Sequence, residues 1–176
     1  RVAFELPSVG RVFVRYLALN RTEEVGLAGI PSLAGAFSAD GRYLLVAKSD
    51  SSGYFVKDLT TSGLIPVDLT NGHGNPLIAN LNAAFSRDGR FLCFTSDLPG
   101  IVNIPIDGRS RCYIHDRNTG RTRTYGAEAA NTGITFSWTS NGISADGRFL
   151  GVTAISDLVN GANTVDTSTL LNPFAP

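Results

Sequence analysis

Three aspartates recur in one short phrase, and a repeated array of carboxylates is a candidate for acid–base or metal chemistry. Each phrase has an apolar residue, Ser, one variable residue, Asp, Gly, Arg and an aromatic residue. Its turn positions are Asp40 and Gly41, Asp88 and Gly89, and Asp146 and Gly147. Asp-Gly between two apolar runs is also the strongest short-range signal of a β-hairpin, because glycine accepts a positive φ and aspartate bonds to the turn backbone. We therefore predict three structural turns and no catalytic role for these carboxylates.

A second group of oxygen-bearing side chains lies in the longest expected loop, residues 96–110. Asp97, Asn103 and Asp107 carry the carboxylate and amide oxygens that Ca²⁺ prefers. Their spacing does not match the Asp-x-Asn-x-Asp-Gly pattern of a calcium-binding loop. Polar side chains that stabilise the loop are therefore the first interpretation, and a calcium site is the alternative. We expect no other cofactor.

The two histidines and two cysteines do not form a metal motif. His73 lies in a polar loop at residues 71–76 and His115 lies in an apolar strand, each without a second histidine nearby. Cys93 and Cys112 fall on successive strands of one predicted unit, where either a disulfide or two buried thiols fits. The sequence contains no nucleophile elbow, phosphate-binding loop or paired-cysteine zinc motif, so it predicts no enzyme active site.

The elements that carry these residues repeat along the chain. The three aspartates are 48 and then 58 residues apart. Each phrase leads into an apolar strand, and in the first two copies a loop, a third strand, a tight turn and a fourth strand follow. Four antiparallel strands, A to D, at this interval predict β-propeller blades, with a sandwich of hairpins as the alternative. The expected all-β chain has strands C and D of a split blade at 1–32, blades at 33–70 and 80–126, and strands A and B with a tail at 134–176.

These units resemble the TolB-like (WD-like) β-propeller repeat. The resemblance rests on Phe-Ser-Ala-Asp-Gly-Arg-Tyr-Leu at residues 37–44, Tyr-Phe-Val-Lys-Asp-Leu at 54–59 and Thr-Ser-Asp-Leu at 95–98. It implies the fold strongly and the function weakly, because such repeats occur in binding scaffolds and in non-catalytic domains beside hydrolases. It also implies an extracytoplasmic location, which is periplasmic, secreted or at the cell surface.

About three blades make an incomplete ring, because known propellers mostly close with about four to eight. We expect the chain to be part of a larger propeller. The alternative is that further copies of the same chain complete the ring, most simply as a dimer.

The charge and the hydropathy of the sequence indicate which kinds of partner the protein can bind. The 176 residues include 15 basic and 15 acidic side chains, a formal net charge of zero, which argues against nucleic acid. No apolar stretch approaches the roughly 20 residues that span a bilayer. We therefore expect a non-catalytic scaffold that binds a protein or a glycan. The alternatives are an accessory propeller domain of a hydrolase and a self-assembling surface or filament subunit.

Overall fold

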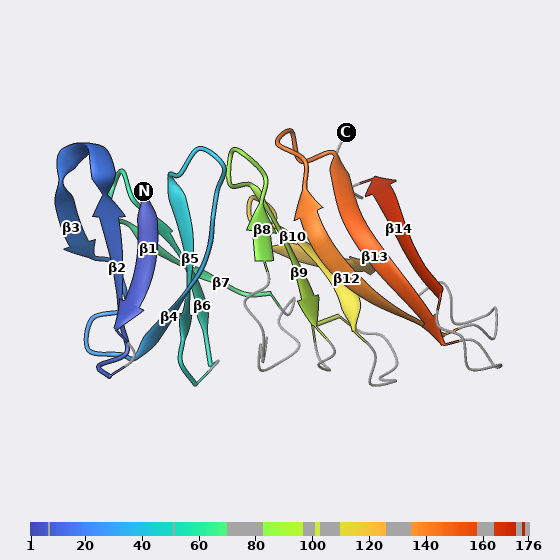
Figure 1. Cartoon of the computed structure of the whole chain (residues 1–176), viewed down its shortest axis with the longest axis horizontal. Coiled ribbons are helices and arrows are strands. Elements are labelled where there is room, and N and C mark those ends of the chain that lie inside the picture. Colours follow the sequence, from blue (N-terminus) through green and yellow to red (C-terminus); the bar gives the residue numbers. More distant parts are fainter. Residues whose placement is uncertain are drawn as a thin grey trace.

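Four antiparallel sheets stand side by side in chain order (Figure 1). The computed structural model describes residues 1–6, 8–50, 52–69, 83–96, 101–102, 110–125, 135–157, 164–171 and 174. Apart from a 3-10 turn, η1 (Leu17–Leu19), every regular element of this part of the chain is a strand. The predicted all-β class is confirmed.

The two middle sheets each have four strands in chain order. Blade 1 consists of β4 (Ser32–Phe37), β5 (Tyr43–Lys48), β6 (Tyr54–Asp58) and β7 (Leu64–Val67). Blade 2 consists of β8 (Ala83–Phe85), β9 (Phe91–Ser96), β10 (Arg111–Asp116) and β11 (Arg121–Tyr125). The strands correspond to A, B, C and D of a propeller blade, so the predicted blade architecture is confirmed.

The two end sheets have three strands each. The N-terminal sheet consists of β1 (Val2–Leu6), β2 (Arg11–Tyr16) and β3 (Arg21–Glu24). The C-terminal sheet consists of β12 (Thr135–Ile143), β13 (Phe149–Asp157) and β14 (Thr164–Leu171). The N-terminal sheet thus has β1 in addition to the two strands expected there, and the C-terminal sheet has a third strand, β14, where a tail was expected.

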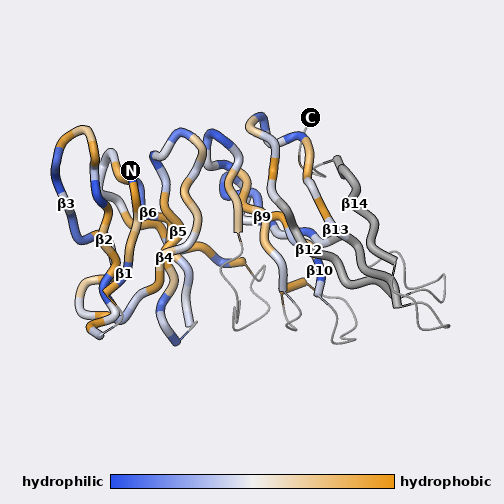
Figure 2. Tube along the Cα trace, in the orientation of Figure 1, coloured by the Kyte–Doolittle hydropathy of each residue, from blue (hydrophilic) through white to orange (hydrophobic). Residues whose placement is uncertain are grey.

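A separate apolar cluster fills each space between neighbouring sheets. Leu44 and Val46 of β5 pack with Val12 and Val14 of the N-terminal sheet, whereas the alternate residue Leu45 packs toward blade 2. Figure 2 shows hydrophobic colour along β5 and β9 and hydrophilic colour at the turns that join β4 to β5 and β8 to β9. The second strand of each blade, which lies between two such clusters, is therefore apolar and buried in an unbroken run, at residues 44–47 of β5 and 91–94 of β9.

Candidate functional site

Hydrogen bonds inside the three Asp-Gly turns engage every turn carboxylate. In each turn a serine hydroxyl donates to the aspartate Oδ1, at 2.6 Å for Asp40, 2.7 Å for Asp88 and 2.5 Å for Asp146. The N–H of the following arginine donates to the same oxygen. The Ser144 hydroxyl and this N–H lower the pKa of Asp146. At Asp40, burial acts to raise the pKa, but the equivalent bonds outweigh it and lower the pKa. These carboxylates hold the turn backbone together.

A second carboxylate, at the end of strand C, joins the two hairpins of each blade. Arg42 Nη2 donates to Asp58 Oδ2 at 2.7 Å, and Arg90 Nη2 donates to Asp116 Oδ2 at 2.9 Å. Both acids are buried, and the bond from Arg42 holds the pKa of Asp58 well below its usual range. Sequence reasoning did not single out Asp58 or Asp116, although each ends an apolar strand immediately before a tight turn.

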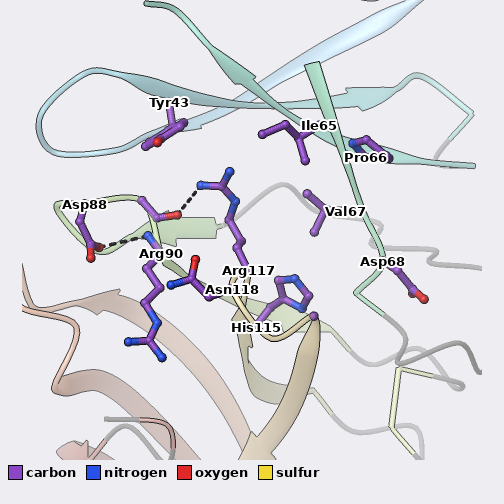
Figure 3. Close-up of a pocket in the computed structure, with 12 residues that line it drawn as sticks. Tyr43, Ile65, Pro66, Val67, Asp68, Asp88, Arg90, His115, Arg117 and Asn118 are labelled. Atoms are coloured by element: carbon purple, nitrogen blue, oxygen red, sulfur yellow. Dashed lines mark hydrogen bonds between the residues drawn. The ribbon is translucent and has the colours of Figure 1, made fainter. Parts of the chain in front are cut away.

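A cleft of about 460 Å³ lies between blade 1 and blade 2 (Figure 3). One wall is β7 and the residue after it, where Ile65, Pro66 and Asp68 are exposed. The other wall is formed by blade 2, from its β8–β9 turn and its β10–β11 turn, where Asn118 is exposed. Apolar groups and the Asp68 carboxylate thus lie on one wall of the cleft, and the Asn118 amide lies on the other.

The side chain of Tyr43 closes one end of this cleft against blade 2. The guanidinium carbons of Arg42 and Arg117 lie 4.8 Å and 4.7 Å from its ring centroid. Arg117 Nη1 also donates to the carbonyl of Gly89 at 2.5 Å (Figure 3). A Cβ atom on Gly89 would lie 2.2 Å from Tyr43 Cδ2, and Gly89 has a φ of +69°. Only glycine lets the turn of blade 2 approach blade 1 this closely.

His115 lines the cleft and is part of a hydrogen-bonded chain between the two blades. The Thr122 hydroxyl donates to the Leu69 carbonyl at 2.8 Å, and His115 Nδ1 lies 3.0 Å from that hydroxyl oxygen. Because the hydroxyl hydrogen is directed to Leu69, Nδ1–H is the donor in the second bond. Burial lowers the pKa of His115 to about 4, so the imidazole is neutral at pH 7.

This arrangement does not provide an activated nucleophile. A general base accepts the proton of the hydroxyl that it activates, whereas the proton of Thr122 is held by a backbone carbonyl. Thr122 is also only 4% exposed, which leaves a substrate no access to its oxygen. Among the described residues, no group of three or more His, Cys, Asp or Glu side chains is placed to hold a metal ion.

Several of the predicted site residues lie outside the described residues. These are the calcium candidates Asp97, Asn103 and Asp107, and the loop histidine His73. Cys93 and Cys112 are both buried in the cluster between blade 2 and the C-terminal sheet, and no disulfide joins them. Of the two alternatives, a disulfide or two buried thiols, the structure has the two buried thiols. The ladder places Cys93 opposite Ile114 and Cys112 opposite Thr95, so the two cysteines are diagonal and not directly opposite.

Comparison with known proteins matches the architecture to solved structures at low sequence identity. The crystal structure of TolB from Acinetobacter baumannii has a TM-score of 0.50 and 15% identity, covering 92% of this chain and 39% of that one. Hydrazine synthase of Kuenenia stuttgartiensis has a TM-score of 0.53 and 16% identity, covering 96% and 47%. Dipeptidyl peptidase 4 of Porphyromonas gingivalis has a TM-score of 0.53 and 13% identity, covering 92% and 26%.

Neither a protein-family model nor a curated protein matches the sequence. The chain spans less than half the length of each of the three solved structures. In the described part of the chain, no helix has the length and hydropathy needed to cross a membrane. The repeated four-stranded blades, their order and these structural matches identify the chain as a TolB-like β-propeller by fold.

Proposed function

We propose that the chain is a non-catalytic binding module of an extracytoplasmic protein, and that the cleft between blade 1 and blade 2 holds a segment of a protein partner. The observation that carries this proposal is the pair of unlike walls. Ile65, 47% exposed, and Pro66 offer apolar surface on one wall. Asn118 offers an amide donor and acceptor on the other. A polypeptide segment matches both walls, because its apolar side chains can pack on Ile65 and Pro66 while its backbone amides bond to Asn118.

The chemistry of the cleft favours a polypeptide over a glycan or a phosphate-bearing ligand. Sugar rings bind by stacking on open aromatic faces, but Tyr43 already carries two guanidinium groups and contacts Gly89. The cations are also engaged, because Arg90 pairs with Asp116 and Arg117 bonds to the Gly89 carbonyl. A cleft whose cations are already paired has little left to attract an anion.

Mutation of the apolar wall tests the site. Peptides that bind the full chain are selected from a random display library, and their affinities are measured by fluorescence polarisation. Ile65→Asp is expected to weaken binding by about tenfold or more, because it places a charge on an apolar contact. Leu19→Asp is the matched control, since Leu19 is 66% exposed on η1, away from the cleft. Equal losses in both variants, or glycan binding that depends on Ile65, would overturn the proposed site.

The non-catalytic role has a separate test. A panel of ester and peptide substrates incubated with the full chain is expected to show the same turnover as buffer. Turnover that disappears in His115→Ala but survives in His73→Ala would contradict this role, because it would assign acid–base chemistry to the cleft.

A second candidate function is an accessory propeller domain of a hydrolase. The match to dipeptidyl peptidase 4, of which this chain covers 26%, favours it. The full-length gene distinguishes the two candidates. An adjacent α/β-hydrolase domain would support the accessory role, and its absence would leave the binding module.

A further inference from the structure

The two arginines that line the cleft between blade 1 and blade 2 already have partners within the protein. Arg90 Nη2 donates to Asp116 Oδ2 at 2.9 Å. Arg117 Nη1 donates to the carbonyl of Gly89, and its guanidinium carbon lies 4.7 Å from the centroid of the Tyr43 ring. Both arginines are half-buried. The positive charge of the cleft is therefore held in place by contacts inside the two blades.

The two aspartates that line the cleft are exposed. Asp88 lies in the β8–β9 turn, and its Oδ1 accepts the Ser86 hydroxyl and the Arg90 N–H. Asp68 directly follows β7, and Figure 3 shows it on the opposite side of the cleft lining from Asp88. Because the carboxylates are exposed and the guanidinium groups are half-buried, the charge that the lining presents to a ligand is mainly negative.

His115 adds no positive charge near Asp68. Burial lowers the pKa of His115, and the charges of Asp116 and Asp68 oppose that shift without cancelling it. The imidazole is therefore neutral at pH 7. The effect of Asp68 on His115 also shows that the Asp68 carboxylate is close enough to act on a charge placed at this end of the cleft.

We propose that the partner segment carries a lysine or arginine side chain that pairs with Asp68 in the cleft. This inference rests on the proposed function, because it names the chemistry of the segment that the same cleft binds. An exposed ion pair changes affinity only a few-fold. Asp68 therefore selects among segments by their charge, whereas the apolar wall at Ile65 and Pro66 supplies the larger share of the contact.

The positions of Ile65 and Asp68 along the chain give the spacing within the segment. Asp68 is three residues beyond Ile65, and β7 (Leu64–Val67) is extended between them. Three extended residues span roughly 10 Å, at about 3.3 Å per residue. A segment that lies extended along this wall covers the same distance with three of its own residues. Its apolar residue and its basic residue are therefore about three positions apart, in either chain direction.

Peptides selected for binding to the full chain from a random display library are the probes. They are expected to be enriched in Lys or Arg about three positions from an apolar residue. In the tightest peptide, the basic residue is replaced by an uncharged one of similar length, norleucine for Lys or citrulline for Arg. Affinities of both peptides for the unmodified chain and for Asp68→Asn are measured by fluorescence polarisation. Either change alone is expected to weaken binding about threefold, and both together no more than either alone.

A matched aspartate away from the cleft is the control for the loss of a negative charge. Asp50 is also exposed, but it lies just beyond β5, at the far end of that strand from Tyr43, and it does not line the cleft. Asp50→Asn is expected to change the affinity by less than about 1.5-fold, since the pair with Asp68 is intact. Raising the salt concentration is expected to weaken binding of the basic peptide and to leave the uncharged peptide unchanged.

The outcomes separate this inference from the proposed function. If peptides bind and Ile65→Asp weakens them, but the losses from Asp68→Asn and from the uncharged peptide simply add, the ion pair is wrong and the site remains. Selected peptides that are no richer in Lys and Arg than the library, or that require an acidic residue, would also overturn the inference alone. An absence of any binding peptide would overturn both.

Discussion

Blade 2 and the C-terminal sheet each contain the same kind of Asp-Gly turn, but the two turns differ in the ion pair that the arginine after the turn makes. In both, a serine hydroxyl accepts the N–H of the aromatic residue, at 3.0 Å for Phe91 and 2.9 Å for Phe149. In blade 2, Arg90 then reaches Asp116, the residue opposite Phe91 in the next strand. In the C-terminal sheet, the residue opposite Phe149 is Leu171.

The turn is therefore separate from the ion pair that joins the two hairpins of a blade, Arg42 to Asp58 in blade 1 and Arg90 to Asp116 in blade 2, which we call the lock. The turn is local and needs only the Ser-x-Asp-Gly phrase. The lock needs a carboxylate on another strand, 26 residues away in blade 2 and 16 residues away in blade 1. Among the described residues, Arg148 has no ion pair and lies over the ring of Phe149 at 5.4 Å. In the described part of the C-terminal sheet, the hairpin thus pairs with the third strand through the β13–β14 backbone ladder and has no ion pair from Arg148.

Among these substitutions, we expect the largest loss of stability from a change at Gly89, which lets the turn of blade 2 contact Tyr43 of blade 1. Gly89→Ala introduces a Cβ into Tyr43 and also forces alanine to a positive φ, so we expect a loss of about 4 kcal/mol in the free energy of unfolding. Gly120→Ala is the control, because it has φ +68° but nothing within 4 Å of its added Cβ, and it should cost about 1 kcal/mol. Urea denaturation measures both.

Gly147→Ala extends this test to the C-terminal sheet. Its Cβ would lie 2.5 Å from Phe91 Cδ2, so its cost should resemble that of Gly89→Ala. A cost no larger than that of Gly120→Ala would mean that the C-terminal sheet is not packed on blade 2 through its turn.

His115 of blade 2 should make the free energy of unfolding depend on pH. The unfolded chain protonates His115 near its usual pKa of 6.5, and the folded chain does so only at about 4 because of burial. Protonation therefore favours unfolding between these values. Stability is fully retained above pH 6.5 and falls by about 3 kcal/mol as the pH drops to about 4. His115→Gln should remove this decline, measured by urea denaturation at a series of pH values. A decline of the same size in the variant would assign the pH dependence to other groups.

The lock itself is tested by matched arginine substitutions. Arg90→Ala leaves Asp116, 1% exposed, without its cation, and we expect a loss of about 2 kcal/mol. This is less than for a fully buried pair, because the Arg90 side chain is 34% exposed. Arg148→Ala should change the free energy of unfolding by less than about 0.5 kcal/mol, because Arg148 is exposed and forms no ion pair among the described residues. Equal losses would remove the distinction between the two regions.

We expect a smaller loss of stability from removing the serine hydroxyl of the turn. This loss should be the same in blade 2 and in the C-terminal sheet. Ser86→Ala and Ser144→Ala each remove a hydroxyl that bonds the aspartate and the aromatic N–H. Each should cost about 1 kcal/mol by thermal denaturation. A clear difference between the two costs would show that the repeated turns are not energetically equivalent.

The turns and the strands beside them could be predicted from the sequence, because their hydrogen bonds join residues that are close along the chain. The Asp-Gly phrases specify their turns within eight residues, and apolar runs on either side predict the strands. Strand β1 (Val2–Leu6) was missed because no Asp-Gly phrase marks a turn beside it. The cleft was also missed, because it depends on how two blades pack. Gly89 is placed by its contact with Tyr43, 46 residues earlier, and no local pattern records that contact.

The most direct test of the separation between turn and lock is amide exchange at two equivalent positions, Phe91 and Phe149, followed by NMR in the full chain and in Arg90→Ala. If the lock restrains the hairpin of blade 2, the Phe91 amide is expected to exchange about tenfold or more slowly than the Phe149 amide. Arg90→Ala is expected to accelerate exchange at Phe91 and to leave Phe149 unchanged. Equal rates in the unmodified chain, or acceleration at both positions in the variant, would contradict a role of the lock separate from that of the turn.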